Sequence, residues 1–255
     1  MLLVGTGLTA VDVALDLASR GHRQIIAASR HGLLPLAHRP VPSDPAPGRP
    51  DGPGLAAVLA WARDAARETG DWRPVVDSLR PVSDTLWRGF SDAERRRLLS
   101  HLHRRWEVAR HRMAPEIADR VRAMQSSGDL TVLAGGVRSV RTTRRGVTAR
   151  LADRTVRVGA IVNCTGPAPD IRLSNHHLVR ELLDSGVVRP GPQGLGLGLA
   201  IRPDGGIPGT DGRLWLVGPL RRGTAWEVTA VPELRVQAAE LPVHFRAPAA
   251  AGSSR

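Results

Sequence analysis

The sequence contains no lysine and no tyrosine, and Cys164 is its single cysteine. A lone cysteine excludes an internal disulfide bond and a metal site built from several cysteines, and it is typical of a reducing cytoplasm. Aromatic residues make up 3% of the chain. We therefore expect a hydrophobic core built mainly from Leu, Val, Ile and Ala.

Long apolar segments are also missing. No run of residues approaches the roughly 20 that a membrane-spanning helix needs. The apolar start of the chain has no basic leader, and Asp12 and Asp16 interrupt it, so we expect neither a signal peptide nor a membrane partner. The formal net charge is +12, but the arginines are scattered and no nucleic-acid-binding module accompanies them. We expect no nucleic-acid partner.

The first thirty residues predict a nucleotide-binding type of unit. Residues 2–4 predict a buried strand, apolar positions in 8–20 recur at helical spacing, and 24–30 predict a second strand. A β-α-β unit of this kind belongs to a parallel sheet with a right-handed crossover. The predicted fold class is α/β, with a Rossmann-type domain.

The rest of the chain predicts helices and then strands. A proline-rich loop covers 38–54, and Ser91 begins a capping box, "SDAE", ahead of a long helix that Pro115 can break. Glycine and proline predict mostly loop over 186–213. We expect helices at 55–69, about 92–126 and 232–241, strands at 130–135, 137–143, 146–152, 154–166 and 213–218, and a hairpin at 144–146.

The turn after the first predicted strand has the form G-x-G-x-x-A, in Gly5-Thr6-Gly7-Leu8-Thr9-Ala10. Gly5 permits the tight turn, Gly7 lets a pyrophosphate approach the backbone, and Ala10 lets the helix pack closely on the strand. The helix N-terminus then offers N–H groups and its positive dipole end to the phosphates. The alternative is a plain β–α turn made of small residues.

The end of the second predicted strand selects the cofactor. An acidic residue there would bind the ribose 2′-hydroxyl of NAD, whereas this chain has Ser29-Arg30-His31. Arg30 can pair with a 2′-phosphate, and Ser29 can donate a hydrogen bond to it. The sequence therefore favours NADP. The alternative is that Arg30 is an ordinary solvated arginine.

Three segments in this order resemble the FAD/NAD(P)-binding flavoproteins of the two-dinucleotide-binding-domain type, and within them the bacterial YdhS-like proteins. The segments are "VGTGLTAVDVAL" with "SRHGLLPLAHRP", "RRWEVARHRMAP", and "GPLRRGTAWEVTAVPELRVQA". The resemblance covers roughly residues 1–242. It implies NADPH-dependent flavin oxidoreduction, in which hydride passes from NADPH to FAD and on to an unknown acceptor.

The resemblance also assigns cofactor-binding residues. The pyrophosphate of NADPH would be held by Gly5, Thr6, Gly7, Thr9 and Ala10, and its 2′-phosphate by Ser29 and Arg30. A turn near both cofactors would consist of Thr165, Gly166 and Pro167. The flavin would be approached by Gly218, Trp226, Glu227, Thr229 and Ala230. Pro219 follows Gly218 where similar enzymes place an acidic residue, so the chain departs from the family pattern at this position.

The family order implies an expectation about the extent of this chain. An FAD-binding half with its own glycine motif precedes the NADP domain in such proteins, so we expect the chain to be a C-terminal portion without that half. A misassigned start codon, a split gene whose product is a partner chain that supplies the missing half, or a decayed gene would each explain this. The predicted domains are an NAD(P)-binding domain over 1–166 with a helical insertion at about 38–126, part of a flavin domain over 167–245, and a disordered tail over 246–255.

The sequence also allows comparison with two other functions. A non-catalytic NADP-binding remnant or partner-binding subunit remains an alternative. A dehydrogenase with a single Rossmann domain would usually supply a Tyr or Lys as acid or base, and the chain has neither. His101 and His103 are two residues apart, a spacing that does not bring metal ligands to one face of a helix. No metal is expected, and catalytic side chains stay unassigned, because a flavin does the chemistry itself.

Overall fold

The computed structural model describes residues 1–41, 44–144, 146–166, 170–191 and 195–244. It divides into two compact units, each of which takes part of the helical segment. Unit 1 comprises residues 1–47, 65–77 and 98–167, and unit 2 comprises 48–64, 78–97 and 168–255. The domain boundaries given above remain predictions. Pro167, Arg145 of the predicted hairpin and the predicted tail over 246–255 lie outside the described residues.

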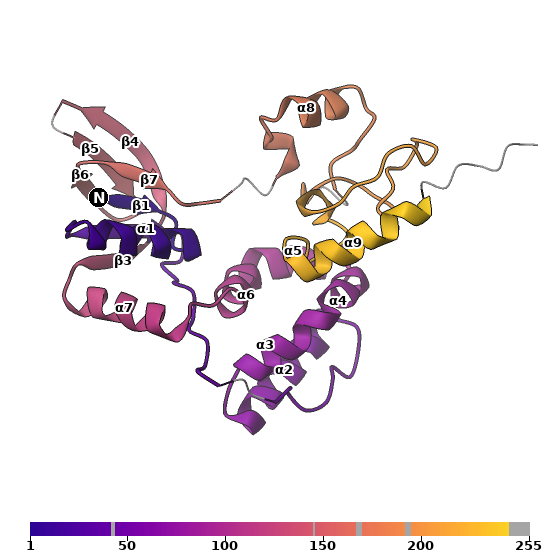
Figure 1. Ribbon diagram of the computed structural model, residues 1–255, viewed down its shortest axis with the longest axis horizontal. Helices are drawn as coiled ribbons and strands as arrows, with labels where there is room; N and C mark the ends of the chain where they lie inside the picture. Colours follow the sequence, from indigo (N-terminus) through magenta and orange to yellow (C-terminus); the bar gives the residue numbers. More distant parts are fainter. Residues whose placement is uncertain (42–43, 145, 167–169, 192–194, 245–255) are drawn as a thin grey trace, which may run out of the picture. The chain divides into compact units, whose positions relative to one another are not determined.

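Unit 1 is built on a parallel sheet of strand order β3-β2-β1-β7 (Figure 1). Its strands are β1 (Leu2–Val4), β2 (Ile25–Ser29), β3 (Leu130–Ala134) and β7 (Ile161–Asn163). Helix α1 (Leu8–Ser19) connects β1 to β2. The predicted β-α-β unit is confirmed, and β1 is the central strand between β2 and β7.

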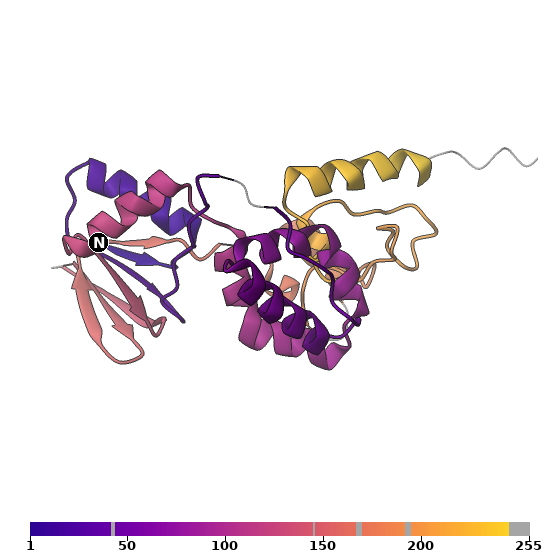
Figure 2. The same cartoon turned by 90° about the horizontal axis from the view of Figure 1, so that it is seen from below.

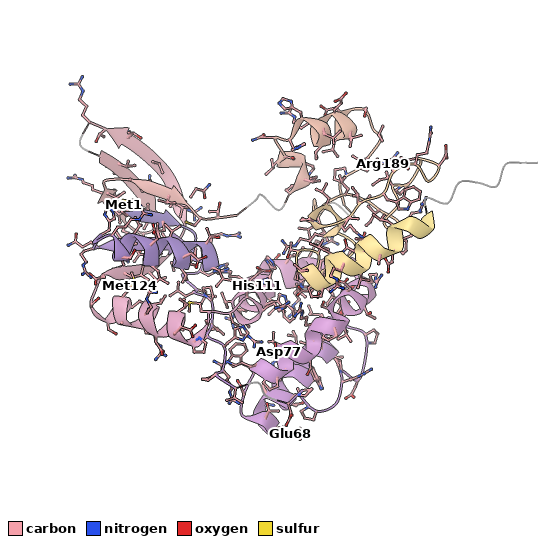
Figure 3. The ribbon with its side chains drawn as sticks, viewed as in Figure 1. Met1, Glu68, Asp77, His111, Met124 and Arg189 are labelled. Carbon is pink, nitrogen blue, oxygen red and sulfur yellow. The ribbon has the colours of Figure 1, made fainter. Side chains whose placement is uncertain are left out.

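The two faces of this sheet have different coverings (Figure 2). On one face Leu3 and Ala27 join a core with residues of α1 and of α7 (Pro115–Ser126). Met124 of α7, labelled in Figure 3, belongs to this core. On the other face Leu2 and Ala28 pack with buried residues of an antiparallel sheet. Successive residues of β1 and β2 therefore pack into two different cores, because successive side chains of a strand point to opposite faces of the sheet.

The antiparallel sheet has the order β4-β5-β6, with β4 (Val137–Thr143), β5 (Gly146–Leu151) and β6 (Thr155–Val158). The prediction of a single strand over 154–166 is wrong, because β6 and β7 lie in different sheets. Gly159 and Ala160 separate them. The carbonyl of Ala160 accepts a hydrogen bond from Leu2 N at 3.0 Å, so the chain joins the parallel sheet from that residue on.

The helical segment is more broken than the sequence predicts. Instead of one helix over 92–126 there are α5 (Asp92–Arg97), a π-helical turn η2 (Leu98–Leu102), α6 (His103–Arg110) and α7. Between α6 and α7, Met113 exchanges backbone hydrogen bonds with Leu36 and His38. This extended pairing ends the helix, and Pro115 begins the next one.

The helices ahead of that break are α2 (Leu55–Thr69), α3 (Arg73–Leu79), the short 3-10 turn η1 (Arg80–Val82) and α4 (Ser83–Gly89). The helix predicted over 55–69 is confirmed. So is the capping box at Ser91: its N–H and hydroxyl both donate to Glu94 Oε2, at 2.9 and 2.7 Å, and its Oγ lies 3.4 Å from Glu94 N.

The C-terminal part of unit 2 consists mostly of loops. It contains η3 (Ile171–Leu173), α8 (His177–Asp184), η5 (Pro219–Arg221) and α9 (Val231–His244). Its core is Ile171, Val188, Leu199 and Ile207. The predicted strand over 213–218 is wrong, since the structure has there a single bridge between Gly206 and Trp215. Helix α9 confirms the predicted closing helix, and α8 was not predicted.

Candidate dinucleotide-binding site

The glycine turn that leaves β1 places its two glycines in different surroundings. Gly5 has φ +113°, and a Cβ built on it would lie 2.5 Å from the carbonyl oxygen of Cys164. Only glycine fits this position, since both the conformation and the close approach exclude a side chain. Gly7 is different: a Cβ there would meet nothing within 4 Å. Open space therefore lies directly over the backbone at Gly7.

The N-terminus of α1 faces that space with its backbone. Gly7 is the N-cap residue and no side-chain hydrogen bond caps the helix. The first helical bond runs from Val11 N to Gly7 O at 3.1 Å, so the N–H groups before it have no helical partner. Thr9 is exposed, and Ala10 is buried at 2% in the core. The site thus offers backbone donors and a positive dipole end to an anion.

Thr6 and Ser29 link the ends of β1 and β2. The Thr6 hydroxyl donates to the carbonyl oxygen of Leu33 at 2.6 Å and lies 2.8 Å from Ser29 Oγ. Because Thr6 has one hydroxyl proton, Ser29 is the donor in the second contact. Ser29 Oγ in turn accepts the N–H of Gly32 at 3.1 Å. The structure directs the Ser29 proton toward Thr6, and its donation to a 2′-phosphate remains a prediction.

Arg30 follows the last residue of β2. Its backbone is hydrogen-bonded, and its side chain is exposed. Its carbonyl accepts the N–H of Gly135 at 3.3 Å, and the Ser29 carbonyl accepts that of Gly136 at 3.1 Å. Both glycines have positive φ. Among the described residues, no hydrogen bond or ion pair reaches the Arg30 guanidinium. The guanidinium is therefore available to an anionic ligand.

Arg104 of α6 is a residue of this site that the sequence analysis missed. Its Nη2 donates to Leu33 O at 2.7 Å and lies 3.2 Å from both Thr6 O and Thr6 Oγ1. Burial lowers the pKa of Arg104, and the Glu107 carboxylate opposes that shift; an arginine side chain still stays protonated. No motif signals this residue, because it comes from a helix about a hundred residues along the chain from the turn.

The turn after β7 comes to the same edge of the sheet. Cys164 is buried, its N–H donates to Val4 O at 2.8 Å, and burial raises the pKa of its thiol. Thr165 is exposed, and its N–H and hydroxyl both donate to Asn163 Oδ1, at 3.1 and 2.8 Å. Gly166 follows with φ +73°. The carboxyl ends of β1, β2 and β7 thus bring Gly5–Ala10, Ser29–Arg30 and Thr165–Gly166 together.

The other predicted site residues belong to unit 2. Gly218 has φ +88°, and its N–H donates to Gln237 Oε1 of α9 at 2.9 Å. The backbone N–H groups of Trp226 and Glu227 both donate to Asp84 Oδ1, at 2.5 and 3.0 Å. Glu227 is 6% exposed, Thr229 is exposed, and Ala230 is half-buried just ahead of α9. Asp84 of α4 therefore fixes the loop that precedes α9.

Two tryptophans reinforce the same loop. The rings of Trp87 and Trp226 lie 4.7 Å apart between centroids and are tilted by 37°. Trp87 is 1% exposed, and its Nε1 donates to Gly223 O at 3.0 Å. The guanidinium of Arg222 lies 5.6 Å from the Trp226 ring, within the range of a cation–π interaction. Helix α4 and this loop form one packed cluster within unit 2.

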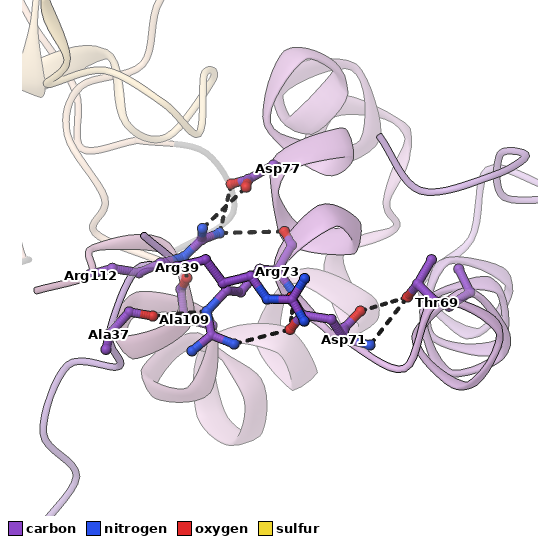
Figure 4. Close-up of polar contacts among 9 residues, drawn as sticks. Ala37, Arg39, Thr69, Asp71, Arg73, Asp77, Ala109 and Arg112 are labelled. Carbon is purple, nitrogen blue, oxygen red and sulfur yellow. Dashed lines mark hydrogen bonds and ion pairs between the residues drawn. The ribbon is translucent and has the colours of Figure 1, made fainter. Parts of the chain in front are cut away.

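In unit 1, a network of arginines and aspartates links the helical segment to the loop after β2 (Figure 4). Asp71 is buried and lies 2.9 Å from Arg39 Nε and 3.1 Å from Arg73 Nη1. Burial alone would raise the pKa of Asp71, but the hydrogen bonds from Arg73 and the charge of Arg39 lower it below its usual value. Arg73 Nε also donates to Ala37 O at 2.9 Å.

The same network continues to Arg112, which follows α6 in the chain. Arg112 is 3% exposed at its side chain and lies 2.6 Å from Asp77 Oδ1. Its guanidinium lies 5.1 Å from the ring of Trp72, and that of Arg73 lies 4.7 Å from the same ring. The segment that carries Arg104 is therefore held by several charged contacts rather than by one.

The described residue ranges show neither a metal cluster nor a membrane-spanning helix. They contain no group of three or more His, Cys, Asp or Glu side chains arranged to hold a metal ion. His103 and His111 instead face Glu107, with Nε2 to carboxylate distances of 3.2 and 3.8 Å. No helix in these ranges has both the length and the apolar composition to cross a bilayer.

Comparison with known proteins defines the fold. No protein-family model matches the sequence, and no curated protein matches it. Among solved structures, the chain is similar to the reduced form of ornithine hydroxylase (PvdA) from Pseudomonas aeruginosa, with a TM-score of 0.54 and 15% identity over 94% of this chain. The fold is α/β, of the Rossmann type. The chain spans 50% of the length of the hydroxylase.

Proposed function

We propose that this chain binds NADPH at the glycine turn and serves the NADPH half-reaction of a flavin-dependent oxidoreductase. The observation that carries the proposal is the open space over Gly7 beside the uncapped N-terminus of α1. Ser29-Arg30, with no carboxylate at the end of β2, favours NADPH over NADH. The likeness in fold to a hydroxylase in its reduced form adds support for redox chemistry.

The residues present fit the dinucleotide. Gly5 allows the turn, Gly7 leaves room for the pyrophosphate, and the N–H groups at the start of α1 would bind its oxygens. The Arg30 guanidinium would pair with the 2′-phosphate. When bound, the nicotinamide would supply a hydride to FAD. The chain itself binds and orients the cofactor.

The FAD part of the proposal rests on the family resemblance. In that assignment Thr165, Gly166 and Pro167 lie near both cofactors, and Gly218 with Trp226, Glu227, Thr229 and Ala230 approaches the flavin. A separate glycine turn would hold the FAD pyrophosphate, from another segment or from a partner chain. The single cysteine is typical of a protein in the reducing cytoplasm.

Calorimetric titration of residues 1–255 with NADPH tests the proposal. Gly7→Val should abolish binding because the added side chain fills the space over the turn, while the ordinary extended backbone at Gly7, φ −83° and ψ −172°, accepts valine. The matched control is Gly159→Val. Gly159 is an exposed glycine of unit 1, and a Cβ built on it would also meet nothing within 4 Å. If Gly7→Val binds NADPH as wild type does, the glycine turn is not the site.

A second measurement separates the oxidoreductase from an NADPH-binding subunit without turnover. We expect residues 1–255 to purify without stoichiometric FAD and to lack NADPH oxidase activity. Among the described residues, β1 and α1 form the unit in which a strand, a G-x-G turn and a helix follow one another. We assign that unit to NADPH, which leaves FAD without a pyrophosphate-binding turn in the described residues. Absorbance between 350 and 500 nm is the readout, and flavin near one per chain would contradict this expectation.

A further inference from the structure

Arg104 brings a positive charge from the helical segment to the glycine turn. The atoms it contacts are the carbonyl and hydroxyl oxygens of Thr6, between Gly5 and Gly7, and the carbonyl of Leu33. The guanidinium therefore lies against the backbone of the turn at Thr6, the residue before Gly7.

The contacts use a single nitrogen of the guanidinium. Nη2 makes all of them, and Nε and Nη1 have no hydrogen-bond partner within the described part of the chain. No carboxylate lies within ion-pair distance of Arg104 in that part. The nearby acid is Glu107, whose two oxygens face His103 and His111 at 3.2 and 3.8 Å. An arginine fixed by one nitrogen, with donors left over, is arranged to bind an anion as well.

We propose that Arg104 is a phosphate-binding residue of this site and contacts the pyrophosphate of the dinucleotide, whereas Arg30 takes the 2′-phosphate. This inference rests on the proposed function, since it adds a residue to the same site. It divides the phosphate groups of NADPH between two arginines from different elements, Arg30 at the end of β2 and Arg104 in α6.

Charge supports this division. The pyrophosphate carries about two negative charges, and a helix N-terminus supplies only about half a positive charge. Arg104 adds a full charge beside the same turn, in a half-buried position where water screens it less than at the surface.

A purely structural role is the competing explanation. Arg104 could serve only to hold α6 against the loop of Thr6 and Leu33. In that case its loss would disturb the whole edge of the sheet, including the end of β2 that Thr6 joins through Ser29. Every ligand of the site would then bind more weakly, whether or not the ligand has a pyrophosphate.

Ligands that differ in their phosphates distinguish the two roles. The experiment titrates residues 1–255 with NADPH, NADH and adenosine 2′-phosphate, by calorimetry or ligand-observed NMR. Arg104→Gln should weaken the binding of NADPH and of NADH by a similar factor. The expected loss of affinity is about tenfold to hundredfold, as for one charge-assisted hydrogen bond. Adenosine 2′-phosphate, which has no pyrophosphate, should bind within twofold of wild type.

Three further variants complete the set. Arg105→Gln, at the exposed neighbouring position, should leave all affinities unchanged. Arg104→Lys keeps the charge and should recover part of the NADH affinity. Arg30→Gln should give the opposite pattern: the affinities for NADPH and adenosine 2′-phosphate should fall, and the affinity for NADH should stay unchanged.

The outcomes separate the two proposals. If wild type binds none of the ligands, the proposed function is wrong and this inference fails with it. If wild type binds and Arg104→Gln weakens every ligand equally, or weakens none, the proposed function stands and the inference is overturned. Thermal unfolding of each variant shows whether it is folded. If Arg104→Gln does not fold, the affinities of Arg104→Lys for the same ligands are used instead.

Discussion

The hydroxyl oxygens of Thr6 and Ser29 lie 2.8 Å apart, so the loop after β1 is bonded directly to the last residue of β2. Thr6 is 2% exposed, and its hydroxyl also donates to Leu33 O and accepts from Arg104. Three segments distant in sequence thus meet at one side chain. The position that the sequence analysis assigned to the pyrophosphate has a side chain that holds the site together.

Thr6→Val should destabilise the protein by about 1–3 kcal/mol, because a valine of similar shape leaves buried polar partners of the hydroxyl unsatisfied. The melting temperature should fall by about 2–4 °C for each kcal/mol in a chain of this size. Calorimetric or circular-dichroism melting measures it. The control Thr155→Val replaces an exposed threonine of β6. An equal loss of stability in that variant would show that the hydrogen bonds of Thr6 do not stabilise the protein.

Substitution of the two turn glycines by alanine should give opposite results. Gly5→Ala places a Cβ 2.5 Å from the Cys164 carbonyl oxygen at φ +113°, which should cost about 2–5 kcal/mol from overpacking and left-handed strain together. Gly7→Ala meets nothing within 4 Å and should leave stability nearly unchanged. Urea unfolding of both variants decides the matter, and similar midpoints for the two would contradict the geometry of the turn.

Arg30→Ala should remove the preference for NADPH over NADH. A charge-assisted contact with the 2′-phosphate is worth about 1.5–3 kcal/mol, which corresponds to roughly a tenfold to hundredfold preference in wild type. Calorimetry with both cofactors measures the ratio of affinities. Arg157→Ala, at an exposed arginine of β6, is the control. A ratio that stays the same in Arg30→Ala would remove Arg30 from the site.

Asp71 should make stability depend on pH. Its pKa is lowered in the folded protein, so the folded state favours the ionised carboxylate. The stabilisation is present above the unfolded pKa of about 4 and is lost as pH falls through the lower folded pKa.

Asp71→Asn should therefore be less stable than wild type at pH 7, by about 1–3 kcal/mol for a buried group with charged partners. The difference should shrink as pH falls below about 4. Urea unfolding at a series of pH values measures both chains. Asp153→Asn, at an exposed pair with Arg154, should change stability little. A difference at Asp71 that does not vary with pH would show that charge is not the cause.

Local patterns were sufficient to predict the first half of the site. The strand, glycine turn and helix at residues 2–20 depend on neighbouring residues, and the structure confirms them. The capping box at Ser91 is local in the same way. In contrast, residues 154–166, which include β6 and β7, read as one continuous strand, because nothing in their sequence shows that the two parts pair with different sheets.

The failures elsewhere have the same cause. Residues 213–218 contain a short apolar run that predicts a strand. In the structure they form only a bridge at Trp215, since the glycine-rich segment opposite does not extend as a strand. Arg104 is not part of a sequence motif. Its place at the turn depends on the backbone pairing of Met113, which follows α6, with the loop around Ala37. Contacts between distant segments decide these positions, and a single sequence does not display them.

The place of β1 between β2 and β7 has a consequence for synthesis on the ribosome. Leu2 pairs with Ile26 and with Ile161, so one neighbour of β1 emerges soon after it and the other about 160 residues later. At about 5–20 residues per second, that interval lasts on the order of 10–30 s. Throughout it the nascent chain carries an unpaired, apolar strand edge. A chaperone that recognises extended apolar segments would find its longest-lived target in residues 2–4.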